Sequence, residues 1–78
     1  MTTFEQLQEA MATTLKLPVS GISEDTNADE LSAWDSLAHV NLMMTLEQTF
    51  DLMLEVEDFE RLVSVPAILE YLKEQGIS

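Results

Sequence analysis

The amino-acid sequence predicts an all-α fold: a four-helix bundle with three longer helices, one short third helix and a long loop between the first two. Apolar residues recur at spacings of three and four over three stretches, as on the buried face of a helix. Turn-forming residues separate these stretches, and no segment favours a strand. With 78 residues the chain has room for one small domain, which we expect to span residues 1–78.

The first helix is expected to begin near the N-terminus and to end before Pro18. Thr3 can cap it, with Gln6 three residues later in the arrangement of a capping box. Its apolar stripe consists of Phe4, Leu7, Met11 and Leu15, with Ala10 beside them. Leu17-Pro18 ends the helix, because the residue before a proline is displaced from helical backbone angles.

Residues 19–34 show no sustained period and predict a long loop. Turn chemistry is concentrated at Ser20-Gly21 and over residues 23–27. The residues expected to anchor the loop on the core are Ile22, Leu31 and Trp34. Loops of this length are uncommon in compact domains and are often functional, so the end of this one, Asp35-Ser36, is where we look first for a site.

The second helix is expected to run from Ser36 to Phe50, capped by Asp35 or Ser36. One apolar stripe consists of Leu42, Met43, Leu46 and Phe50, and a second, on roughly the opposite side, of Leu37, Val40 and Met44. A bundle helix needs only one buried face. The second stripe therefore packs beneath the long loop, as we expect for Val40, or faces a partner, as we expect for Leu37 and Met44.

The C-terminal third predicts a connection over residues 51–56, a short helical turn over 57–62, and a last helix. The turn is expected to carry Phe59 and Leu62 inward. Ser64 can cap the last helix, with Pro66 tolerated in its first turn. The core face of this helix consists of Ala67, Ile68, Tyr71 and Leu72. Gly76 is expected to close it with left-handed backbone angles.

The charge balance is strongly acidic. Fifteen Asp and Glu residues stand against three Lys and Arg residues, a net charge of -12. This argues against nucleic acid and anionic lipid as partners and favours enzymes with basic docking surfaces. With no cysteine and one histidine, His39, no metal site is expected. We find no membrane-inserting segment and no cationic leader, and expect a cytoplasmic monomer.

The acidic loop and the second helix each contain part of the pattern of another site type. The one-three-five spacing that opens a calcium loop is formed by Asp25, Asn27 and Asp29. It fails because Glu30 and Ser36 replace the required glycine and the closing glutamate. Ser36 and His39 could touch across one helical turn, but no residue orients the imidazole and no oxyanion loop accompanies them. We expect His39 to be half-buried, with its ring edge in solvent.

Ser36 stands at the N-terminus of the expected second helix, where free N–H groups and the helix dipole favour a phosphate. An ordinary helix cap is the simplest interpretation of a serine there. The surrounding sequence closely resembles the carrier helix of acyl carrier proteins. The resemblance is carried by Trp34, Asp35, Ser36 and Leu37, followed by Leu42, Leu46, Glu47, Phe50 and Asp51. It extends over nearly the whole chain.

This resemblance implies a carrier that is modified and used by separate enzymes and is not itself an enzyme. Ser36 would bear a 4′-phosphopantetheine arm from coenzyme A, whose thiol carries acyl or aminoacyl thioesters in lipid, polyketide or nonribosomal peptide synthesis. Asp35 would assist recognition by the phosphopantetheinyl transferase. The residues implied to face loading and condensing enzymes are Leu37, Val40, Met44 and Glu47. The alternative is an unmodified acidic helical protein-interaction domain of the same fold.

Three positions depart from the fatty-acid carriers of that family. Ala38 and Asn41 stand where those carriers usually present acids, and Trp34 stands where housekeeping members have a small residue. The chain resembles carriers of specialised pathways more closely. Phe59 lies where related carriers lodge a fatty chain, which predicts a small cargo pocket.

Overall fold

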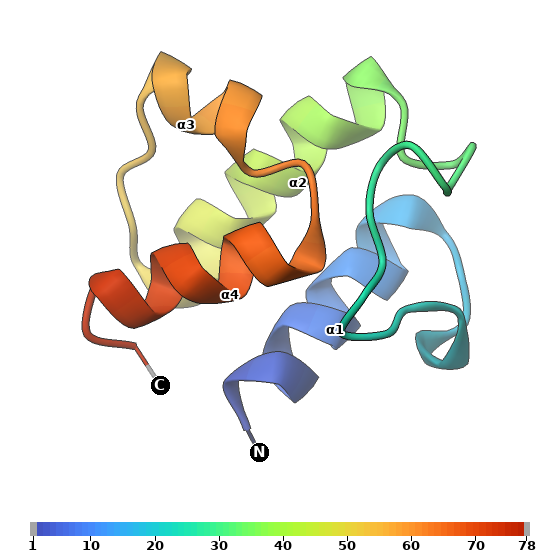
Figure 1. The fold of residues 1–78 in the computed structure, drawn as a ribbon, viewed down its shortest axis with the longest axis horizontal. Helices are drawn as coiled ribbons and strands as arrows, with labels where there is room; N and C mark the ends of the chain where they lie inside the picture. Colours follow the sequence, from blue (N-terminus) through green and yellow to red (C-terminus); the bar gives the residue numbers. More distant parts are fainter. Residues whose placement is uncertain (1, 78) are drawn as a thin grey trace.

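The computed structural model describes residues 2–77 and confirms the all-α bundle. Its helices are α1 (Thr3–Leu15), α2 (Ser36–Phe50), α3 (Val56–Arg61) and α4 (Val65–Glu74), and a 3₁₀ turn, η1 (Val19–Gly21), lies in the long loop. Over residues 2–77 there is no strand, only an isolated antiparallel bridge between Asn27 and Ser64. Figure 1 shows α3 at the edge of the bundle opposite the two chain ends.

One hydrophobic core joins α1, α2 and α4 with parts of the connecting segments. The side chains with almost no exposed surface are Leu7, Met11, Ile22, Leu42, Met43, Leu46, Leu62, Val65, Ile68 and Leu72. The predicted inner faces of the three longer helices are thus confirmed, while Phe4, Phe50 and Ala67 pack half-buried at the margin of the core. Each fully buried aliphatic side chain contributes about 1.5–3 kcal/mol, so this cluster dominates the stability of the domain.

The predicted limits of α1 are displaced at both ends. Thr2, not Thr3, is the N-cap, and it exchanges two hydrogen bonds of 3.1 Å with Glu5 in a capping box. The pair Thr3 and Gln6 has the same spacing, but a carboxylate is more favourable than an amide at a helix N-terminus. The helix ends at Leu15, because Lys16 adopts left-handed angles (φ 59°, ψ 45°). The chain turns there, and Leu17 packs half-buried against the core.

The long loop is fixed by its own hydrogen bonds as well as by buried anchors. Ile22 and Trp34 are buried, as predicted, and Leu31 is half-buried. The Gln8 side chain on α1 donates to the carbonyls of Val19 and Ile22, at 3.0 and 2.7 Å. A second tether links this loop to the entrance of α4. It consists of the bonds from Ala28 N–H to the Val63 carbonyl and from Val65 N–H to the Thr26 carbonyl, at 2.9 and 2.8 Å.

The last two helices confirm the predicted order. Phe59 is half-buried on α3, and Leu62, directly after this helix, is buried; α3 begins at Val56, one residue before the predicted turn. Ser64 caps α4 by accepting the Ala67 N–H at 3.2 Å. Gly76 has φ 84°, and the bonds from its N–H to the Lys73 carbonyl and from Ile77 N–H to the Leu72 carbonyl close α4 as a Schellman motif.

Candidate functional site

Ser36 is the first residue of α2 and is exposed at the end of the long loop. Asp35 is the N-cap, one of the two caps that the sequence allows. Its carboxylate accepts the Ala38 N–H at 2.9 Å, and its carbonyl accepts the His39 N–H at 2.8 Å. The serine is therefore not used as a cap. Within residues 2–77 the Ser36 hydroxyl has no hydrogen-bond partner.

This geometry suits a phosphate ester on the serine oxygen. The first N–H groups of a helix have no intrahelical acceptor, and the Asp35 carboxylate satisfies only that of Ala38. The N–H groups of Ser36 and Leu37 remain available to phosphate oxygens, at the positive end of the helix dipole. An exposed hydroxyl beside free N–H donors fits a covalently attached phosphopantetheine group.

The predicted partner stripe is exposed along α2. The exposed fractions are 73% for Leu37, 43% for Val40 and 51% for Met44. The expectation that Val40 packs beneath the long loop is wrong. The loop is tethered to α1 through Gln8 and to the entrance of α4 through Thr26 and Ala28, so these tethers do not draw it across this face.

Glu47 has a structural contact that the sequence did not indicate. Its side chain is half-buried, and its carboxylate accepts the Leu54 N–H at 3.0 Å, across the connection between α2 and α3. It lies eleven positions from Ser36, about 16 Å along the helix axis. Glu47 and Ser36 are therefore on one helix but not in one site, and the glutamate holds the α2–α3 connection in place.

His39 is half-buried, as expected, but its ring edge is not free in solvent. The indole N–H of Trp34 donates to Nδ1 at 2.9 Å, and Nε2 bonds to the carbonyl oxygen of Phe59. Both ring nitrogens are engaged, which excludes a pairing with Ser36 in this structure. The sequence does not indicate this contact, because one of the two partners is a backbone carbonyl twenty residues away.

The acidic loop residues bond to each other. The Asn27 amide donates to the Glu30 carboxylate at 2.9 Å, and the Glu30 N–H donates to the Asn27 side chain at 3.0 Å. Among residues 2–77, no three acidic or histidine side chains gather in the manner of a metal site. The carboxylate-rich loop is thus organised by local turns.

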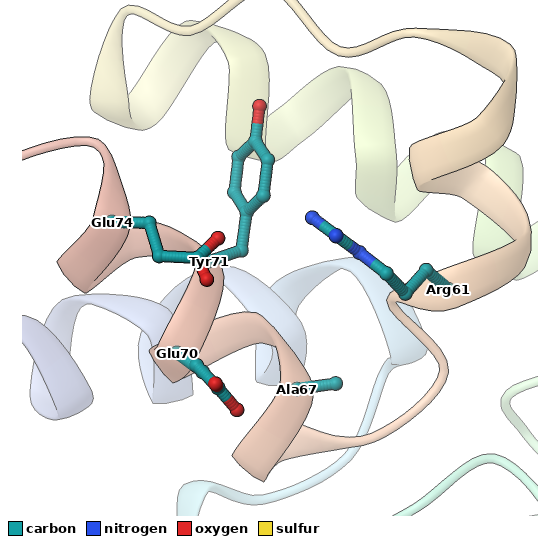
Figure 2. Close-up of a pocket in the computed structure, with 5 residues that line it drawn as sticks. All are labelled: Arg61, Ala67, Glu70, Tyr71 and Glu74. Carbon is teal, nitrogen blue, oxygen red and sulfur yellow. The ribbon is translucent and has the colours of Figure 1, made fainter.

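A shallow pocket of about 150 Å³ lies between the end of α3 and α4 (Figure 2). Its lining consists of Arg61, Ala67, Glu70, Tyr71 and Glu74. Figure 2 shows Arg61 reaching toward the Tyr71 ring, 5.5 Å from its centroid. Burial, and then the charge of Asp58, raise the pKa of the Tyr71 hydroxyl above its ordinary value, while Arg61 opposes that rise. These charged walls do not suit an alkyl chain.

No helix within residues 2–77 has the length and apolar character needed to cross a bilayer. This small helical bundle presents a free, exposed serine hydroxyl at a helix N-terminus. That is the architecture of a carrier protein modified by a phosphate-linked arm. The family described as "Phosphopantetheine attachment site" matches residues 5–72. The chain belongs to the acyl carrier protein family.

Relatives support this assignment over most of the chain. The acyl carrier protein of Exiguobacterium sp. is 40% identical over 68 residues, which are 86% of this chain and 85% of that protein. The acyl carrier protein of Clostridium acetobutylicum is 35% identical over 71 residues, covering 90% and 91%. That of Desulforapulum autotrophicum is 37% identical over 55 residues, or 70% of each.

Membership of this family confirms the main functional predictions. The protein is a carrier and not a catalyst, and its prosthetic group is covalently attached 4′-phosphopantetheine. It interacts with a phosphopantetheinyl transferase and with acyl-handling enzymes.

Proposed function

We propose that Ser36 is the attachment point of the phosphopantetheine arm and that the thiol of the arm carries thioesters between the enzymes of a biosynthetic pathway. The observation that carries this proposal is the exposed Ser36 hydroxyl, left free because Asp35 caps α2 in its place. In the transfer, Ser36 Oγ forms a bond to the phosphate that bears the pantetheine. The bond from that phosphate to the nucleotide part of coenzyme A breaks, and the hydroxyl proton passes to the transferase.

The residues around Ser36 support this chemistry by binding and orientation. Asp35 keeps the first turn of α2 formed and offers its exposed side to the transferase. The free N–H groups of Ser36 and Leu37 stabilise the phosphodiester charge after transfer. We assign no base to the carrier, because its single histidine is engaged elsewhere; the transferase takes the hydroxyl proton.

Mass spectrometry tests the attachment site directly. The protein is incubated with coenzyme A, Mg²⁺ and a promiscuous phosphopantetheinyl transferase, and we expect the mass of one arm to be gained. Ser36→Ala should abolish the gain. Ser32→Ala is the matched control, because Ser32 is also exposed and lies four residues earlier, in the loop that leads to α2. Absence of a gain in the natural sequence would instead favour the unmodified interaction domain.

The partner surface in this proposal is the exposed apolar face, defined as Leu37, Val40, Met44, Met53 and Val56. The last two, at 90% and 80% exposed, lie in the α2–α3 connection and at the start of α3. Glu47 is the only acid within α2, and its carboxylate is already engaged. The exposed acids that follow this helix are Asp51 at its C-cap, Glu55 at the N-cap of α3, and Glu57 and Glu60 on α3 itself.

This distribution supports a particular kind of docking surface on a partner enzyme. It should offer an apolar depression for Leu37, Val40 and Met44, with Lys or Arg side chains on the side that meets α3. Attraction between the α3 acids and those cations speeds encounter, while the apolar contacts determine the lifetime of the complex. Because α2 itself contributes little free charge, we place the chain with specialised carriers and not with the fatty-acid carriers it departs from.

The cargo in this proposal is short. The Phe59 ring is half-buried beneath α3, and the bond between His39 and the Phe59 carbonyl joins α2 to α3. A long acyl chain would have to separate these elements to reach the core. Loading with a long-chain thioester should therefore leave the melting temperature close to that of the unloaded carrier. Marked stabilisation by the long chain, relative to an acetyl group, would contradict the small pocket.

A further inference from the structure

His39 connects three parts of the molecule that are separate in sequence. Its backbone is in the first turn of α2, its Nδ1 accepts the indole N–H of Trp34, and its Nε2 bonds to the Phe59 carbonyl on α3. The rings pack as well as bond. The imidazole centroid is 6.0 Å from that of Trp34 and 6.5 Å from that of Phe59, the latter in an edge-on arrangement.

The partners of the imidazole determine its tautomer. An indole N–H can only donate a hydrogen bond, so Nδ1 must carry a lone pair. A carbonyl oxygen can only accept, so Nε2 must carry the hydrogen. One neutral tautomer, with its proton on Nε2, satisfies both contacts of His39 at once. Over residues 2–77 no carboxylate lies within ion-pair distance of the ring.

On the α3 side, the imidazole acts as a C-terminal cap. The last carbonyls of a helix have no intrahelical donor. In α3 the Leu62 N–H bonds to the Asp58 carbonyl and the Val63 N–H to that of Arg61, which leaves the Phe59 carbonyl to His39. A six-residue helix is marginal by itself. The bond from α2 therefore helps to hold α3 formed and in position.

On the loop side, the imidazole fixes the residue that leads into the attachment site. Trp34 is buried, its N–H bonds to the Leu31 carbonyl at 3.0 Å, and the next two residues are Asp35 and Ser36. Without the bond to His39, the buried indole N–H would lose its acceptor, which is unfavourable for a polar group out of contact with water. The orientation of Trp34 and the direction in which Asp35-Ser36 leaves the loop are thus linked.

We propose that His39 is a positioning residue that holds the Asp35-Ser36 junction in a fixed position relative to α3. The transferase would then bind the junction and α3 together. This inference rests on the proposed modification of Ser36. Its consequence is that loosening either contact of the imidazole slows transfer onto Ser36, although His39 touches neither the serine nor the arm.

Three substitutions test the two contacts separately. His39→Leu removes both, and Trp34→Phe removes the indole donor while keeping a buried ring. His39→Gln keeps one acceptor and one donor. We expect kcat/KM for transfer onto Ser36 to fall about fivefold in Trp34→Phe, the effect of losing one neutral hydrogen bond, and further in His39→Leu, which loses two. His39→Gln should restore most of the rate. Gln48→Leu, an exposed change at the far end of α2, is the control for added apolar surface.

A spectroscopic readout separates positioning from stability. Trp34 is the only tryptophan, so its indole N–H gives one resonance in an amide correlation spectrum. That resonance should shift and exchange faster in His39→Leu, and a long-range nitrogen correlation should show the hydrogen of His39 on Nε2. Hydrogen exchange of the α3 amides should rise in His39→Leu and stay near the natural level in Trp34→Phe, whose Phe59 contact is intact.

The possible results distinguish failure of the positioning role of His39 from failure of the proposed modification of Ser36. Equal transfer rates in all variants, or a His39→Gln as slow as His39→Leu, overturn the positioning role. If His39→Leu does not fold, Trp34→Phe and His39→Gln decide the matter by the same comparison. If the natural protein takes up no arm at all, the proposed function fails, and the indole and α3 exchange measurements still test the bridge itself.

Discussion

The two faces of α2 are built from the same kinds of residue but serve opposite purposes. Met43 is fully buried in the core, while its neighbour Met44 is 51% exposed. The same contrast separates the buried Leu42 from the exposed Leu37. A side chain that stays in solvent contributes little to folding free energy. Aliphatic residues kept on such a face are therefore available to a partner, and the buried face alone holds the helix in the bundle.

The largest expected effect tests this contrast with the two adjacent methionines. Met43→Ala should lower the free energy of unfolding by about 2–5 kcal/mol, through lost burial and the cavity left behind. Met44→Ala should change it by less than about 0.5 kcal/mol. Urea denaturation followed by circular dichroism measures both. Equal losses in the two variants would mean that both faces carry the fold.

A smaller effect is expected on docking, with the roles of the faces reversed. Leu37→Ala and Val40→Ala should each weaken binding to a loading enzyme by about 1–2 kcal/mol, while the melting temperature stays unchanged. Val19→Ala is the matched control, because Val19 and Val40 are both 43% exposed and Val19 lies on the loop, in η1. Titration calorimetry against the partner gives the affinities. A similar loss in Val19→Ala would point to nonspecific apolar contact.

Variants of Glu47, near the end of α2, distinguish the effect of its charge on partner association from the effect of its hydrogen bond on stability. Glu47→Ala should cost about 1 kcal/mol of stability by removing the acceptor of the Leu54 N–H. Glu47→Gln keeps an acceptor oxygen and should retain most of the stability. If the charge of Glu47 steers partners, both variants will slow association equally in stopped-flow measurements. If Glu57→Gln has the larger effect on association and its salt dependence, steering comes from the exposed acids of α3.

Local chemistry explains why the sequence predicted α2 so closely. Asp35 is a strong N-cap, and the helix spans the predicted residues Ser36–Phe50, ended by left-handed angles at Asp51. The inner stripe followed from helical periodicity alone, as did Ile68 and Leu72 on α4. Capping and periodicity depend on residues within one or two turns, which a single sequence displays directly.

The features that the sequence did not reveal depend on contacts between distant segments. The contacts of Glu47 with the Leu54 N–H and of His39 with the Phe59 carbonyl use backbone groups as partners, and every residue type carries those. The exposure of Val40 was mispredicted because it depends on the path of the loop, which is set by tethers at Thr26 and Ala28. The two caps available to α1, at Thr2 and Thr3, differed only in the chemistry of the residue three positions later.

The smallest expected effect is on the pKa of Tyr71, which responds to the charged residues of α3 and of the α2–α3 connection. It is the only tyrosine, and burial, Asp58, Glu55 and Glu47 all raise its pKa, against the opposing effect of Arg61. Because the pKa is raised in the folded state, the contribution of this group to stability is present in full below its ordinary value of 10.0. That contribution is lost as the pH rises through the higher folded value. Tyr71→Phe should remove this alkaline loss in urea titrations.

In ultraviolet titrations of the tyrosinate, Glu47→Gln should lower the midpoint and Arg61→Gln should raise it. If both substitutions left the midpoint unchanged, the charges of the α2–α3 connection would be too well solvated to act on one another, and steering by the α3 acids would be weak for the same reason.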